Sequence, residues 1–278
     1  MGEQTGIAWT DHTWSPWHGC TKVSPGCQHC YADALNHRWG HDNWGPGKPR
    51  RIVKDWGKPE LYNRKARADG VRRKIFPSMC DPFDLEVPVR YFADLINLIE
   101  RTESLDWLLL TKRPEAVQSR LLEIGRERLP ENVWLGVSVE NQIWANRRIP
   151  LLLSIPATVR FLSLEPLLGF IDLTGQSVGS LWIDQDYADL DLSGLGQIVA
   201  NEGWPIHWAI IGGESGPGAR AMEPEFVTSL LRQLARAQIK TFFKQTGTVL
   251  AKTMKLKHSK GEDPSEWPEE WRVQEFPA

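Results

Sequence analysis

The sequence lacks the features that would place the protein in a membrane or mark it for secretion. No run among its 278 residues approaches the roughly eighteen apolar residues of a transmembrane helix. The N-terminal stretch has no basic region followed by an apolar one, so no signal peptide is predicted. We therefore expect a cytoplasmic protein with no membrane partner.

Cysteine is also scarce, with four in the whole chain. Without a secretion signal, we expect these thiols to bind a metal or cluster rather than to form disulfides. Cys20, Cys27 and Cys30 share the spacing C-x6-C-x2-C within one short stretch. A loop of this length can bend three sulfurs toward one point. A four-iron cluster on three protein thiolates would keep one iron open for another ligand.

The same stretch could instead bind a zinc ion. Thiolates and imidazoles both bind zinc, and His29, His37 or His41 could supply a fourth ligand. His37 and His41 stand four residues apart on an expected helix, so they share one face. The spacing alone leaves both the cluster and the zinc site open.

Positive charge is concentrated in one segment, although the net charge is only −2. Residues 48–74 hold eleven Lys or Arg against three acidic residues. Such a stretch fits an anionic partner such as nucleic acid, or a solvated helix and loop. Six of the fourteen tryptophans precede residue 57, where they either stack on bases or pack in a core.

Short apolar runs alternate with amphipathic segments along the chain. The expected strands are residues 6–9, 75–76, 106–110, 133–139, 159–164, 207–211 and 240–243. The expected helices are residues 89–101, 115–128, 142–153 and 224–237. This alternation indicates a parallel sheet. We predict an α/β fold, a partial (β/α) barrel of about six to seven parallel strands, although an open sheet would gather its strand ends in the same way.

The domain organisation follows from breaks in this rhythm. Residues 1–250 are expected to form the barrel domain. An insertion rich in Asp and Gly interrupts it at about residues 171–206. Residues 251–278 read as a polar C-terminal tail.

Polar residues follow most of the expected strands, at the edge where barrels and open sheets place their chemistry. Cys80 follows the second strand. It is either a fourth ligand, a hydrogen-atom donor or a small buried residue. Ser138, Glu140 and Asn141 follow the fourth strand, where they either contact a ribose and an amino-acid head or cap a helix.

The remaining strands end in charged or glycine-rich segments. Lys112 and its neighbour Arg113 can pair with a carboxylate or a phosphate. Glu165 is either a ligand at the rim or an acceptor for loop amides, and Lys244 ends the last strand. The turn that begins Gly212-Gly213-Glu214 either binds a nucleotide or simply joins a strand to a helix. It lacks the Lys-Ser/Thr ending of a P-loop, so NTP hydrolysis is not expected.

Six blocks carry a resemblance to a known family. In order, they are WSPWHGCTKVSPGCQHCYA, LLLTKRP, NVWLGVSVEN, RFLSLEPLLG, IIGGESGPGARAM and FFKQTG. Together they resemble a phage- and prophage-associated family of unknown function, the phage Gp37/Gp68 type, which is regarded as radical-SAM-like. The blocks run from about residue 9 to about residue 247, most of the chain.

The resemblance implies a radical S-adenosylmethionine (SAM) enzyme with a 4Fe-4S cluster on Cys20, Cys27 and Cys30. Such an enzyme cleaves SAM and abstracts a hydrogen atom from a substrate. We expect an electron-donor protein and favour a nucleic acid or nucleotide substrate. The rival is a zinc-containing nucleic-acid-binding protein without radical chemistry.

The expected site residues divide by role. Those that would contact the cofactor are His29, Tyr31, Lys112, Ser138, Glu140, Asn141, Gly212 and Gly213. Those that would act on the substrate are Cys80, Glu165, Glu214 and Lys244. The sequence departs from the usual radical SAM pattern in two places. Its first cysteine gap has six residues instead of three, and SMCDPF stands where a glycine-rich motif usually follows the second strand.

Overall fold

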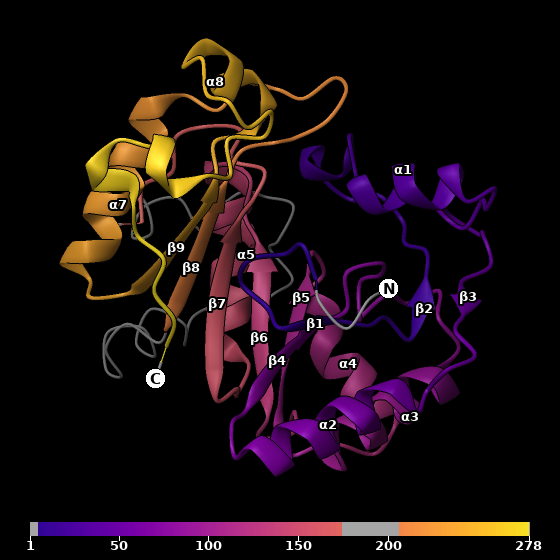
Figure 1. The fold of residues 1–278 in the computed structure, drawn as a ribbon. Helices are drawn as coiled ribbons and strands as arrows, with labels where there is room; N and C mark the ends of the chain where they lie inside the picture. Colours follow the sequence, from indigo (N-terminus) through magenta and orange to yellow (C-terminus); the bar gives the residue numbers. More distant parts are fainter. Residues whose placement is uncertain (1–4, 174–205, 278) are drawn as a thin grey trace. The chain divides into compact units, whose positions relative to one another are not determined.

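The predicted fold class, an α/β partial barrel of about six to seven parallel strands, is confirmed. The computed structural model describes residues 5–173 and 206–277. Its seven-stranded parallel sheet has the order β1-β4-β5-β6-β7-β8-β9, and most strands are separated by helices (Figure 1). Almost all of the expected insertion at residues 171–206 lies outside the described residues. Within the described ranges, no helix has the length and apolar character needed to cross a membrane.

The chain divides into two compact units, which are described in turn. The first comprises Met1–Gly136 and Ile155–Val159, and the second Val137–Ser154 and Arg160–Ala278. The elements of the first unit are β1 (His12–Thr13), β2 (Trp17–His18), η1 (Pro25–Cys27), α1 (Tyr31–Arg38), β3 (Arg51–Ile52), α2 (Lys58–Asp69), β4 (Arg73–Phe76), α3 (Val89–Glu100), β5 (Leu105–Thr111), α4 (Glu115–Glu123) and the start of β6 (Val133–Ser138).

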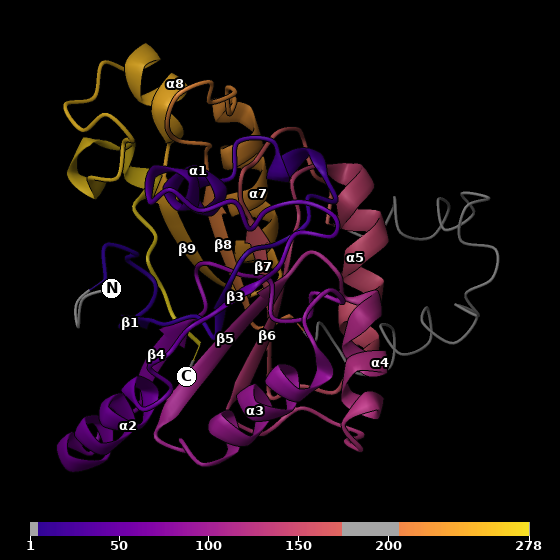
Figure 2. The same cartoon turned by 90° about the vertical axis from the view of Figure 1, so that its right-hand side faces the viewer.

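In the first unit, parallel strands pack against amphipathic helices. Ile75 of β4 pairs with His12 of β1 on one side and with Trp107 of β5 on the other. Helix α3 buries Leu95 and Leu98 completely, at the spacing that the sequence predicts for its apolar face. Helices α1 and α2 lie at opposite ends of this unit (Figures 1 and 2).

Two elements in this unit differ substantially from the prediction. Residues 6–9 form no strand: the amide of Thr10 donates to the carbonyl of Ile7 (3.3 Å) in a turn, and the first strand is His12–Thr13. The apolar character there reflects burial of Trp9, whose ring packs against Phe76. The helix expected over residues 115–128 ends at Glu123, because the backbone reverses through Gly125 at φ 69°.

A small antiparallel sheet closes the base of the loop that carries the cysteines. Trp17 pairs with Ile52, and His18 pairs with Arg51. The intervening chain, residues 19–50, therefore leaves and returns at the same point. This pairing was not predicted, because each strand has only two residues.

Most of the six tryptophans before residue 57 are buried in the hydrophobic core. Trp9, Trp14, Trp17 and Trp44 are buried, whereas Trp39 is 45% exposed. The ring of Trp14 meets Trp107 of β5 edge-on, with centroids 5.9 Å apart. Packing, rather than base stacking, therefore accounts for the four buried tryptophans.

The second unit combines parallel strands with a covered edge strand. Its elements are the end of β6, α5 (Gln142–Ser154), β7 (Val159–Leu164), β8 (Trp208–Gly212), α7 (Pro224–Arg236), β9 (Lys240–Gln245), α8 (Gly247–Thr253), η3 (Pro264–Glu266) and η4 (Glu269–Trp271). Ile210 of β8 pairs with Ser163 of β7 and with Phe242 of β9, all in parallel.

The C-terminal segment lies along β9 in the antiparallel direction (Figure 1). The amide of Phe243 donates to the carbonyl of Val273 (2.8 Å). Two tryptophans, Trp267 and Trp271, are buried against Phe243. The polar segment after residue 251 thus holds a small aromatic core.

Replacing Trp267 with alanine tests the contribution of this segment. The side chain is 1% exposed, and its indole N–H donates to the carbonyl of Gly261 (2.9 Å). We expect the free energy of unfolding, measured by urea denaturation, to fall by about 3–5 kcal/mol. The control Phe170→Ala removes an aromatic side chain that is 52% exposed. It should cost less than about 1 kcal/mol, and equal losses for both variants would contradict the packing described here.

Candidate functional site: a cysteine loop held by buried arginines

Three cysteines lie on one loop, residues 19–31, which we term the cysteine loop. Cys20 follows β2, Cys27 ends η1, and Cys30 precedes α1. Cys20 and Cys30 pack against one hydrophobic cluster, formed by Ala32, Trp44 and Met79. None of the chain's four cysteines forms a disulfide.

Gly19 allows the loop to approach its neighbours closely. Its φ is +126°, a conformation that side chains rarely adopt. An added Cβ would lie 2.4 Å from the carbonyl oxygen of Asn43. The amide of Gly19 donates to the carbonyl of Met79 (3.2 Å), and its backbone pairs with Cys80. The first cysteine therefore lies directly beside the chain that follows β4.

A buried arginine joins the cysteine loop to the segment that follows it. The Arg50 side chain is fully buried, and its Nε donates to Asp84 (2.7 Å). The same guanidinium donates to Thr21 Oγ1 (2.7 Å). It also donates to three backbone carbonyls, those of Asn43 (3.3 Å), Gly45 (3.1 Å) and Lys48 (2.8 Å). One cation therefore stabilises the fold of residues 43–48 and their link to Thr21.

A second arginine reaches the first cysteine itself. Arg113 donates to Asp81 Oδ2 (2.9 Å), to the carbonyl of Thr21 (2.5 Å) and to Cys20 Sγ (3.5 Å). Asp81 also accepts from the Thr111 hydroxyl (2.7 Å) and from the amide of Lys112 (3.0 Å). The aspartate therefore joins the ends of β4 and β5 and orients the guanidinium toward the loop.

The environment of Cys20, Cys30 and Cys80 favours the protonated thiol at neutral pH. Burial, together with the nearby Asp81 carboxylate, raises the pKa of Cys20 to about 12, while Arg113 acts in the opposite sense. Burial also raises the pKa of Cys30, against the Asp33 amide and Lys112, and it raises the pKa of Cys80 well above its usual value. Ligation by these sulfurs would therefore have to displace protons.

The residue types of the cysteine loop are compatible with an iron–sulfur cluster. Across residues 5–173 and 206–277, no group of three His, Cys, Asp or Glu side chains is gathered closely enough to hold one metal ion. Ligands of a cluster bind different irons, so they need not converge on one atom. Three thiols on one loop, an apolar wall and N–H donors aimed at sulfur are the surroundings that such clusters use.

Aromatic residues and histidines in and beside the cysteine loop have the following surroundings. The Tyr31 hydroxyl donates to the carbonyl of Ser78 (2.7 Å), while His29 is half-buried between η1 and α1. His37, one of the histidines considered for zinc, lies 3.1 Å from the Asp33 carboxylate. His18 is buried, and burial together with Arg51 lowers its pKa to about 4, so the ring is neutral at physiological pH.

In the second unit, the residues after β6 form a buried cluster. Glu140 is fully buried and accepts a hydrogen bond from Arg148 (2.9 Å). Arg148 also donates to the carbonyl of Ser138 (2.8 Å). Asn141 Oδ1 accepts from the amide of Trp144 at the start of α5 (3.3 Å), which is the helix-capping role considered for it.

Glu165 and Lys244 form a partly exposed ion pair beside two glycines. Their charged atoms lie 2.9 Å apart, with side-chain exposures of 14% and 26%. A Cβ on Gly212 would lie 2.4 Å from the Glu165 carboxylate, and one on Gly213 would lie 2.2 Å from the carbonyl oxygen of Thr246. The glycines therefore leave room for the ion pair and for the chain after β9.

An ion pair between Glu214 and Arg220 links the two ends of the glycine-rich turn. Glu214 is 7% exposed and accepts from the Arg220 side chain at both carboxylate oxygens (2.6 and 2.9 Å). The amide of Gly213 donates to the carbonyl of Gln245 (3.0 Å). The tight-turn role therefore accounts for the contacts seen at these residues.

The predicted rim residues fall into two groups, one in each unit. The group in the first unit is Cys20, Cys27, His29, Cys30, Tyr31, Cys80 and Lys112. The group in the second unit is Ser138, Glu140, Asn141, Glu165, Gly212, Gly213, Glu214 and Lys244. That both groups serve one site stays a prediction.

The sequence reasoning missed Asp81, Asp84 and the role of Arg50. The two aspartates stand in the CDPFD segment directly after β4, at the strand end where functional carboxylates gather. Their position after a strand could have identified them as candidate site residues. Their partners could not have been found, because Arg50 and Arg113 lie 34 and 32 residues away along the chain.

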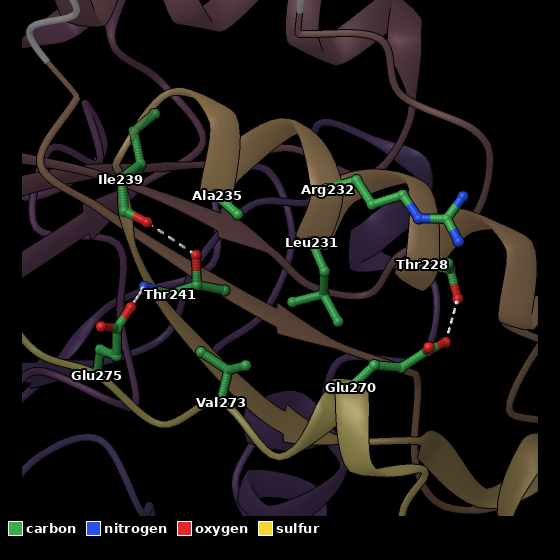
Figure 3. Close-up of a pocket in the computed structure, with 9 residues that line it drawn as sticks. All are labelled: Thr228, Leu231, Arg232, Ala235, Ile239, Thr241, Glu270, Val273 and Glu275. Atoms are coloured by element: carbon green, nitrogen blue, oxygen red, sulfur yellow. Dashed lines mark hydrogen bonds between the residues drawn. The ribbon is translucent and has the colours of Figure 1, made fainter.

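A separate hollow of about 230 Å³ lies in the second unit, between α7, β9 and the C-terminal segment (Figure 3). Glu270 accepts from the Thr228 hydroxyl at its rim (3.5 Å), and Leu231 and Val273 provide apolar walls. None of the predicted site residues lines it. We assign it no role in the chemistry.

The thiol environment gives a testable pH dependence. Because only the thiolate reacts with iodoacetamide, and the pKa of Cys20 is about 12, its alkylation in reduced, metal-free protein should still accelerate from about pH 9 to about pH 11. In urea-unfolded protein the rate should level off just above the ordinary pKa of about 8.5. Peptide mass spectrometry measures both rates, and matching profiles would contradict the buried environment.

Comparison with known proteins identifies a family but no function. Neither the curated proteins nor the solved structures give a match. A family model does match, over residues 4–271, which is nearly the whole chain and includes all three cysteines of the loop. The chain therefore belongs to this family, described as protein of unknown function (DUF5131).

Proposed function

We propose that this protein is a cytoplasmic radical SAM enzyme of the phage-associated type, with Cys20, Cys27 and Cys30 as the ligands of a 4Fe-4S cluster. The observation that carries the proposal is the set of three thiols on one loop, with the guanidinium of Arg113 directed at the first sulfur. When bound, such a cluster supplies one electron, which cleaves SAM to methionine and a 5′-deoxyadenosyl radical that abstracts a hydrogen atom from the substrate.

The chain's own residues prepare the loop for an anionic group. Arg113 donates an N–H to Cys20 Sγ, and Lys112 and the Asp33 amide favour the thiolate form of Cys30. The two cations and the amide dipole offset part of the negative charge that three thiolates bring. The hydrophobic cluster packs against Cys20 and Cys30 and gives two of the thiols an apolar neighbour.

The second unit offers polar groups for SAM or substrate. Glu165 and Lys244 present a carboxylate and an ammonium group that are both partly exposed. This pairing suits the zwitterionic head of an amino acid, which can bond each charge with its opposite. Lys244 can also hold or donate a proton at Nζ, and Glu165 can accept one at a carboxylate oxygen.

A nucleic acid or nucleotide is the substrate class that we favour. Helix α2 exposes basic side chains, including Arg64 and Arg67. Other basic residues of the same segment pair locally, such as Arg72 with Asp106. The exposed face of α2 supports an anionic partner, and an electron-donor protein completes the proposal.

Anaerobic reconstitution with iron and sulfide tests the proposal. We expect close to four irons and four sulfides per chain, broad absorbance near 400 nm, and 5′-deoxyadenosine from SAM and dithionite. The variants C20A, C27A and C30A should each lose most of the iron. C80A is the matched control, because it removes a buried thiol outside the C-x6-C-x2-C stretch, and it should retain the iron.

Measuring the metal and sulfide content also distinguishes the radical SAM enzyme from the zinc-containing nucleic-acid-binding protein. Stoichiometric zinc in aerobically purified protein, without iron or sulfide after reconstitution, would support the zinc-containing nucleic-acid-binding protein. That protein would also bind DNA or RNA with an affinity that falls as salt rises. A cluster that forms without producing 5′-deoxyadenosine would reject the radical SAM assignment alone.

A further inference from the structure

We infer that Arg113, fixed by Asp81, is a positioning residue that holds the first cluster-binding cysteine in place and hydrogen-bonds its sulfur. The inference rests on the proposed function and deepens it, because it names residues outside the cysteine motif that would tune the cluster.

The first step is the geometry of Arg113. Its side chain is 9% exposed, and one guanidinium nitrogen lies 2.9 Å from Asp81 Oδ2 and 3.5 Å from Cys20 Sγ. The other terminal nitrogen donates to the carbonyl of Thr21 (2.5 Å). The planar guanidinium therefore bonds the backbone and the sulfur of adjacent loop residues at once, which a lysine cannot do.

The second step is the fixation of Asp81. Its Oδ1 accepts from the Thr111 hydroxyl (2.7 Å) and from the amide of Phe83 (3.0 Å). Its Oδ2 accepts from the amide of Lys112 (3.0 Å) and from Arg113. With each oxygen bonded twice and a side-chain exposure of 6%, the carboxylate has one orientation. It therefore sets the direction in which Arg113 points.

The third step is the chemistry at sulfur. Hydrogen bonds to the sulfurs and nearby positive charge raise the reduction potential of iron–sulfur clusters, because they stabilise the added electron. Arg113 provides both at Cys20. Its removal should therefore make the cluster harder to reduce and leave the three cysteine ligands in place.

The test compares R113Q, R113K and D81N with a matched control, R120Q. Arg120 is also a buried arginine of the first unit, but it donates to Glu123 (2.8 Å) and to the carbonyl of Val87 (3.0 Å). Loss of a buried guanidinium is common to R113Q and R120Q, so a difference between them isolates the contact with Cys20.

Two measurements are made on each variant. Hydrogen exchange of the metal-free protein reports the order of the loop. We expect exchange in peptides covering residues 19–24 to be about tenfold faster in R113Q, as follows from losing charge-assisted hydrogen bonds. Redox titration of the reconstituted protein, followed by electron paramagnetic resonance, should give a more negative midpoint potential in R113Q and a smaller shift in R113K. D81N also removes a negative charge beside Cys20, so it is compared by its loop exchange alone.

The outcomes are distinguishable. If R113Q and R120Q share the same loop exchange and the same potential, the inference is overturned. Faster exchange with an unchanged potential would overturn the effect of Arg113 on the cluster potential and leave a role in loop order only. If the wild-type protein binds no cluster, the proposed function and the tuning fail together, and the exchange data alone decide whether Arg113 positions the loop.

Discussion

Two buried carboxylate–guanidinium pairs hold the cysteine loop in its conformation. Asp81 and Asp84 lie in one turn after β4, and they bind Arg113 and Arg50. Each arginine then bonds to Thr21, one at its carbonyl and the other at its hydroxyl. Burying one partner without the other would leave an uncompensated charge, so the turn and the loop depend on each other. The cysteine loop has little regular secondary structure, so these side-chain contacts stabilise its conformation.

In the second unit, the carboxylates of Glu140, Glu165 and Glu214 are paired in the same way, and that of Glu165 is the most exposed of the three. Glu140 with Arg148 and Glu214 with Arg220 close the turns that follow β6 and β8. These carboxylates have both a structural partner and low exposure. The pair of Glu165 and Lys244 is more exposed than the buried pair of Glu140 and Arg148, so it is better placed to exchange its internal contact for one with a ligand.

The sequence predicted the elements whose signal is local. Runs such as residues 106–110 and 159–164 contain enough apolar residues to indicate buried strands, and the structure has strands there. Residues 6–9 were wrongly predicted to form a strand, because a short apolar stretch around one buried tryptophan resembles a strand in sequence. The C-terminal segment concealed two buried tryptophans within a polar composition.

Interactions between distant residues could not be predicted from one sequence. The cysteine triplet stands out by its spacing, but the arginines that bond around it have no spacing signal. The glycine-rich turn is a second example. Its sequence motif does not reveal that Arg220 donates to both carboxylate oxygens of Glu214.

Anomalous X-ray scattering from crystals of the anaerobically reconstituted protein tests the central claim most directly. The account predicts an iron signal bonded to the sulfurs of Cys20, Cys27 and Cys30, with one iron that has no protein ligand and with Arg113 still beside Cys20 Sγ. A single peak at the zinc edge that shares these sulfurs with a histidine would contradict it, and so would iron bound at any other place in the chain.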